Sequence, residues 1–90
     1  MLSYTEMGSF FENMGMMVRA GISVNEAVDL LKEEREGEKP QLAKTYEKMS
    51  SEMQIGASLE MAMKDSGQFP EYAVDMIGAS EYTGRLEATL

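Results

Sequence analysis

The chain has 90 residues, with eight basic and sixteen acidic side chains and a net charge of −8 at pH 7. Nucleic-acid binding needs a basic surface that neutralises phosphates, so this charge argues against DNA and RNA as partners. Cysteine and histidine are absent, which removes thiolate chemistry and the commonest general base and transition-metal ligand. We expect a single domain over residues 1–90, with no metal and no cofactor.

The first predicted helix begins near Tyr4 or Thr5, with Thr5 as candidate N-cap, and ends at Gly21. Its apolar residues repeat at i, i+4, i+7 and i+8, which is the spacing of one helix face: Phe10, Met14, Met17 and Val18. Gly21 suits the left-handed conformation that follows a helix end.

The second predicted helix begins after Ser23, which opens the capping-box pattern Ser23-x-x-Glu26. Its apolar face follows helical spacing: Val24, Ala27, Val28 and Leu31. The helix runs into an acidic stretch that extends from Glu33 to Glu38 and is interrupted by Gly37.

The acidic stretch carries the candidate partner-binding residues of the chain: Glu33, Glu34, Glu36 and Glu38. The helix dipole disfavours like negative charges at a C-terminus, so this segment is either solvated or paired with a cationic partner. Its alternating carboxylates resemble a calcium loop, but Lys39 and Thr45 stand where that loop needs its glycine and its bidentate glutamate. A weak calcium site is therefore only an alternative to a solvated helix end. We therefore hypothesise that these four glutamates dock a basic surface of a partner protein. The alternative is that they are only solvated and keep the domain soluble.

Four more helices follow, and no segment alternates apolar and polar residues as a strand would. Pro40 suits the first turn of the third helix, which Gly56 closes; its apolar positions are Leu42, Tyr46, Met49 and Met53. Ser58 caps the short fourth helix, which ends at Gly67 and faces inward through Leu59, Ala62 and Met63. Pro70 opens the fifth, with the stripe Phe69, Ala73, Met76 and Ile77; Gly84 follows, and residues 86–90 form the first turn of a sixth.

A pseudo-repeat relates residues 11–31 to residues 46–66, because Gly21-Ile-Ser-Val matches Gly56-Ala-Ser-Leu at an offset of 35 positions. The alternative is that the two Gly-x-Ser turns are independent uses of a good helix stop followed by a good helix start. Each unit is an αα-hairpin that cannot bury its apolar side alone. The sequence therefore predicts an all-α antiparallel bundle of about six helices, built from two hairpins plus a C-terminal pair whose last helix is truncated. The predicted core is Phe10, Met14, Val18, Val28, Leu31, Met49, Met53, Leu59 and Met63.

Motifs for catalysis are missing from the chain. It has no phosphate-binding loop and no GxGxxG, and its Gly-x-Ser turns lack both the final glycine of a nucleophile elbow and a histidine to activate the serine. We expect a protein that is not an enzyme, in which Gly21, Ser23, Gly56 and Ser58 are turn and cap residues.

Three ordered motifs carry a resemblance to a known family. The first motif consists of Phe10, Met14 and the continuous segment Met17-Val-Arg-Ala-Gly-Ile-Ser-Val-Asn-Glu-Ala27. The second is Gly56-Ala-Ser-Leu-Glu-Met-Ala-Met63. The third consists of Phe69-Pro70 and, further along the chain, Ser80-Glu-Tyr-Thr-Gly-Arg-Leu86. In these residues the chain resembles the cytoplasmic F domain of the inner-membrane platform protein shared by type II secretion and type IV pilus machines. Ser80 stands where that family usually has glycine.

The resemblance implies a non-enzymatic scaffold at the cytoplasmic face of the bacterial inner membrane, touching the assembly ATPase and other platform or pilus subunits. It implies that the full-length protein is membrane-anchored outside this segment, since family members continue the sixth helix into a membrane span. Glu81, Thr83 and Gly84 carry over as a turn-and-cap motif, in which Thr83 or Gly84 caps the sixth helix.

Two further expectations follow. A truncated sixth helix leaves apolar surface uncovered, so we expect a homo-oligomer. The alternative function, a free-standing helical-repeat adaptor, rests on the repeat length, which is close to the ~34 residues of tetratricopeptide repeats, although their aromatic signature is missing.

Overall fold

The computed structural model describes all 90 residues; 76% of them are helical and there is no strand, which confirms the predicted all-α class. Six helices follow in chain order: α1 (Tyr4–Arg19), α2 (Val24–Arg35), α3 (Pro40–Gln54), α4 (Leu59–Ser66), α5 (Glu71–Thr83) and α6 (Leu86–Thr89).

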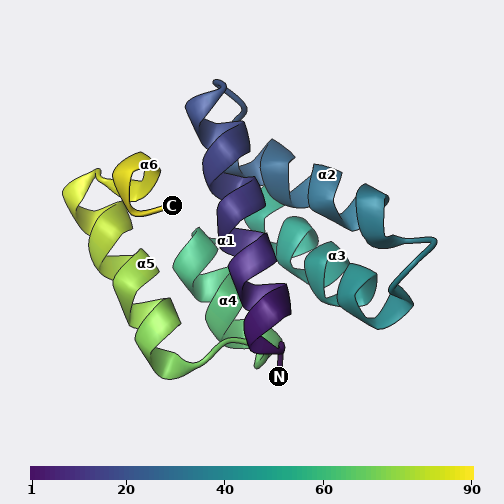
Figure 1. Ribbon diagram of the computed structural model, residues 1–90. Helices are drawn as coiled ribbons and strands as arrows, with labels where there is room; N and C mark the ends of the chain where they lie inside the picture. Colours follow the sequence, from purple (N-terminus) through teal and green to yellow (C-terminus); the bar gives the residue numbers. More distant parts are fainter.

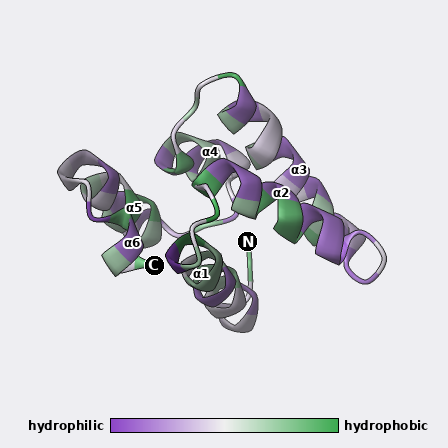
Figure 2. Cartoon of the chain, turned by 90° about the horizontal axis from the view of Figure 1, so that it is seen from above, coloured by the Kyte–Doolittle hydropathy of each residue, from purple (hydrophilic) through white to green (hydrophobic).

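The helices form three side-by-side parts (Figures 1 and 2). α1 and α4 lie in the middle, the antiparallel pair α2–α3 lies on one side, and α5 with α6 lies on the other. The most extensive helix packing joins α2 to α3. The turn between these two helices projects at one end of the molecule, away from the central helices (Figure 1).

One hydrophobic core joins the first five helices. Every residue of the predicted core is buried except Val18, which is half-buried near the end of α1. The largest fully buried side chains include Phe10, Met14, Met49 and Met63. Methionine thus serves as core filler in this chain, because its flexible thioether adapts to irregular gaps between helices.

Phe10 stands at the centre of an aromatic cluster that ties α1 to the rest of the bundle. Its ring lies 5.0 Å from the ring of Phe69, 5.2 Å from that of Phe11 and 5.6 Å from that of Tyr46, measured between centroids. Aromatic pairs at these separations attract beyond their area burial. The cluster therefore joins α1, α3 and the α4–α5 connection in one contact.

Two predicted details of the helices are wrong. The N-cap of α1 is Ser3 and not Thr5: the Ser3 hydroxyl accepts a hydrogen bond from the Glu6 N–H, and the Glu6 carboxylate accepts one from the Ser3 N–H. In α5, Met76 is 43% exposed, and Val74 and Ser80 are buried instead. The buried face of α5 is thus formed by Ala73, Val74, Ile77 and Ser80.

The two Gly-x-Ser turns have the same geometry. Gly21 has φ +94° and Gly56 has φ +109°. In both turns the N–H of the residue after the glycine donates a 3.0 Å hydrogen bond to a carbonyl five residues earlier, which satisfies a carbonyl at the helix end. Ser23 and Ser58 then cap the next helix by accepting a hydrogen bond from the N–H three residues on.

Gly21→Val is expected to lower the free energy of unfolding by more than about 1 kcal/mol, because a β-branched residue tolerates positive φ badly. No side chain or backbone atom crowds the position, so the effect isolates the backbone conformation. Chemical denaturation measures it, with Gly37→Val as control, since Gly37 also has open space but no positive φ. Equal midpoints for the two variants would contradict this account of the turn.

The junction between α5 and α6 differs from the expectation for the sixth helix. Gly84, at φ +73°, is the C-cap of α5, and Arg85 precedes α6 without a side-chain cap. Thr83 lies in the last turn of α5, where its hydroxyl donates to the Ala79 carbonyl at 3.0 Å. Neither Thr83 nor Gly84 therefore caps α6.

Candidate protein-interaction surfaces

Glu81 joins two segments that lie far apart in the sequence. Its carboxylate accepts hydrogen bonds from the N–H groups of Leu59 and Glu60, both at 3.0 Å. Ser58 accepts from the next N–H, that of Met61, at 3.1 Å. The first turn of α4 thus has its free N–H groups satisfied by two side chains, one from its own N-cap and one from α5. A negative charge at this helix N-terminus is also favoured by the dipole.

The four acidic residues predicted to bind a partner are all exposed, at the end of α2 and in the α2–α3 turn. We call them the acidic turn: Glu33, Glu34, Glu36 and Glu38. α2 ends at Arg35, so Glu36 and Glu38 lie beyond the helix. The acidic turn projects at the right of Figure 1, and the helix ends that meet there are hydrophilic in Figure 2.

The acidic turn does not form a closed ion-binding site. No three carboxylates of the structure are gathered closely enough to hold a metal ion. Glu34 accepts a 2.9 Å hydrogen bond from the neighbouring Arg35, while 62% of its side chain stays exposed. The negative charges therefore face solvent, where another molecule can reach them.

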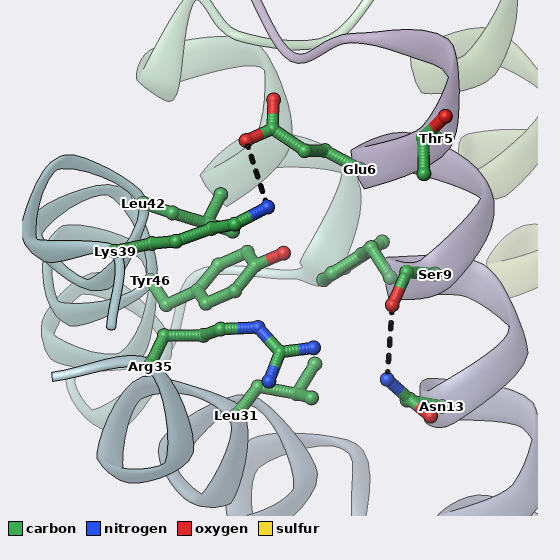
Figure 3. Close-up of a pocket in the computed structure, with 10 residues that line it drawn as sticks. Thr5, Glu6, Ser9, Asn13, Leu31, Arg35, Lys39, Leu42 and Tyr46 are labelled. Carbon is green, nitrogen blue, oxygen red and sulfur yellow. Dashed lines mark hydrogen bonds and ion pairs between the residues drawn. The ribbon is translucent and has the colours of Figure 1, made fainter. Parts of the chain in front are cut away.

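A small polar pocket opens beside the acidic turn, between α1 and the α2–α3 pair (Figure 3). Its volume is about 110 Å³. We call it the basic pocket because the side chains of Arg35 and Lys39 extend across it toward α1. Leu31, Leu42 and Phe10 form its apolar floor, and Ser9 and Asn13 line the α1 side.

Two groups in the basic pocket have shifted pKa values. Burial raises the pKa of the Tyr46 phenol to about 12. The pKa of Glu6 is lowered, chiefly because the Ser3 backbone N–H donates to its carboxylate. The second Glu6 oxygen lies 3.8 Å from the Lys39 ammonium. Both groups therefore have fixed charge states near neutral pH.

The sequence did not indicate Arg35 and Lys39 as candidate binding residues, because they lie within and next to an acidic run in a strongly acidic chain. The signal that could have found them is their spacing of four residues around the turn. Whether they face α1 depends on how α2 and α3 pack across it, which the local pattern does not determine.

No helix of the structure combines the length and the hydrophobicity needed to cross a membrane. Among curated proteins, none matches the chain. A family model does match: the one described as type II secretion system (T2SS), protein F, aligns with residues 10–90. The match contains all three motifs of the sequence, and the Glu81 contact brings the second and third of them together. The chain therefore belongs to the type II secretion system protein F family, as a domain of a secretion or pilus platform protein.

Proposed function

We propose that this domain is a non-enzymatic scaffold that docks the assembly ATPase, and with it other platform or pilus subunits, on the cytoplasmic face of the inner membrane. The observation that carries the proposal is the acidic turn: four exposed carboxylates at one projecting end of the bundle. Membership in a platform family supports the class of partner.

The acidic turn would act mainly on the rate of association. Exposed charges attract an oppositely charged surface over about one Debye length, roughly 8–10 Å at physiological salt. Such steering raises the association rate and weakens as salt is added. We therefore infer that the surface of the ATPase that meets this turn is basic.

Charge reversal of the acidic turn tests the proposal. Changing Glu33, Glu34, Glu36 and Glu38 to lysine is expected to lower the association rate with the assembly ATPase about tenfold or more at low salt, and to abolish most of its salt dependence. Stopped-flow or surface-based kinetics at low and high salt provide the measurement.

The matched control reverses four exposed acids elsewhere on the surface: Glu12, Glu71, Asp75 and Glu87. It changes the net charge by the same amount, so it separates the position of the charges from their number. Equal effects of the two variants, or no effect of the first, would mean that the acidic turn only keeps the domain in solution.

We also propose that the domain associates with a second copy. Several large apolar side chains lie exposed near the beginnings of α1 and α5: Met1 at 74%, Tyr4 at 87% and Tyr72 at 61%. Exposed apolar patches favour association. Sedimentation at high micromolar concentration is expected to show dimers or larger species, and a single monomeric species would contradict this.

A further inference from the structure

We propose that the basic pocket binds one carboxylate side chain, an aspartate or a glutamate, of a partner protein. Its donors converge from two sides of the pocket: Arg35 and Tyr46 from the α2–α3 pair, and Ser9 from α1 (Figure 3). This site lies beside the acidic turn. The turn is proposed to meet a basic surface, whereas the pocket is proposed to bind an acidic side chain, so the inference goes beyond the docking role of the turn.

Arg35 is the principal donor. Only 18% of its side chain is exposed, and its guanidinium lies near Leu31 and Tyr46 (Figure 3). Within the chain the guanidinium makes one hydrogen bond, from Nη1 to Glu34. A guanidinium carries five N–H groups in a planar fork that matches a carboxylate. The remaining N–H groups are therefore available to a ligand that enters the pocket.

Tyr46 supplies a second, neutral donor. The residue is 2% exposed, its ring stacks on Phe10, and its hydroxyl makes no hydrogen bond within the chain. A phenol is protonated at neutral pH, so the hydroxyl can donate to an anion. Glu52 Oε2 is the only buried side-chain oxygen or nitrogen without a partner, so the Tyr46 hydroxyl opens into the pocket, where a ligand can reach it.

The size and the other charges of the pocket define the ligand. A volume of about 110 Å³ accepts the end of one side chain, and it is far below the roughly 300–1,000 Å³ of pockets that hold small molecules. Glu6 lines the same pocket, and the acidic turn is adjacent. Arg35 is paired with Glu34 and Lys39 with Glu6, so the pocket has little net positive charge to hold a doubly charged phosphate. We infer that the ligand is a singly charged acidic side chain.

The test is an NMR titration of the ¹⁵N-labelled chain with the capped peptide acetyl-Gly-Glu-Gly-amide. We expect saturable shifts of the backbone amides of Leu31, Arg35 and Tyr46 at millimolar peptide. The same peptide with glutamine is expected to give no saturable shift. Inorganic phosphate at equal concentration is expected to bind more weakly than the glutamate peptide.

Variants assign the effect to the donors. Arg35→Gln is expected to weaken peptide binding about tenfold, because it removes the charged fork. Tyr46→Phe keeps the ring in the core and is expected to weaken binding severalfold, which gives a second test if Arg35→Gln folds poorly. Lys44→Gln, an exposed lysine of α3 outside the pocket, is the matched control and is expected to bind as the unchanged chain does.

Three results would overturn the proposal: no saturable shift at these amides, equal binding of the glutamine peptide, or unchanged affinity in both pocket variants. Tighter binding of phosphate than of the glutamate peptide would overturn the assignment of the ligand. None of these measurements involves the ATPase, so the outcome is independent of the role proposed for the acidic turn.

Discussion

Phe10→Ala is expected to lower the free energy of unfolding by about 3–5 kcal/mol, the range for removing a buried phenylalanine. Phe10 is 1% exposed and packs its ring against Phe11, Tyr46 and Phe69. The substitution therefore deletes a fully buried ring and leaves a cavity where α1, α3 and the α4–α5 connection meet. A domain of this size has a total stability of only about 5–13 kcal/mol, so a large fraction of it would be lost.

Urea denaturation followed by circular dichroism measures this loss. Phe11→Ala serves as control, since Phe11 neighbours Phe10 on α1 but is only partly buried, and a smaller loss is expected there. Phe10→Leu keeps most of the volume and gives a measurable midpoint if the alanine variant is largely unfolded. A loss below about 1 kcal/mol for Phe10→Ala would contradict the central position of this ring in the core.

Glu81→Ala is expected to lower the free energy of unfolding by about 2 kcal/mol. The carboxylate accepts two hydrogen bonds from the first turn of α4, at Leu59 and Glu60. Hydrogen bonds to charged groups contribute about 1.5–3 kcal/mol, and a negative charge at a helix N-terminus adds to this. Partial exposure of Glu81 lets water replace part of what is lost, so the expected loss is smaller than the sum of two such hydrogen bonds.

The control for this variant is Glu87→Ala, which removes an exposed glutamate of α6 that forms no hydrogen bond or ion pair through its side chain. Amide hydrogen exchange adds a local readout. In Glu81→Ala, the N–H groups of Leu59 and Glu60 should exchange faster than they do in the unchanged chain, and this increase should be larger than that of the N–H groups of α3. Equal stability of the two variants would show that the link between α5 and α4 contributes nothing.

The helix positions were predictable because their signals are local. Periodic apolar residues and the glycines at positive φ determine where each helix begins and ends, and Gly21 and Gly56 needed only their immediate neighbours to be interpreted. The Ser3–Glu6 capping box was also readable in the sequence, as a serine followed three residues later by glutamate. Thr5 is likewise a residue type that caps helices, so the local pattern offers two possible starts for α1.

The orientation of α5 and the role of Glu81 could not be predicted in the same way. Small residues near the end of α5 make several faces almost equally suited to burial, and the choice between Met76 and Val74 depends on α4. The contact between Glu81 and Leu59 joins residues 22 positions apart. Both features are set by how helices pack across the chain, and local spacing contains no information on that.

The acidic turn shows the same division. Its exposure followed from its charge and its place at a helix end, and the structure agrees. The cationic side chains beside it were hidden by the excess of acidic residues, because their role depends on the surface of α1 that faces them. The net charge therefore predicts that the surface as a whole is acidic, but it does not predict the local charge of an individual pocket.

The central claim is that the acidic turn contacts the assembly ATPase, and site-specific photo-crosslinking in the full-length protein tests it most directly. A photoreactive residue replaces Glu36 in one variant. In the control it replaces Tyr82, which is 94% exposed. This residue belongs to α5, the helix on the side of the bundle away from the turn (Figure 1). The account predicts a crosslink to the ATPase from position 36 and none from position 82. Crosslinking from position 82 alone would contradict it and would place the docking surface on α5.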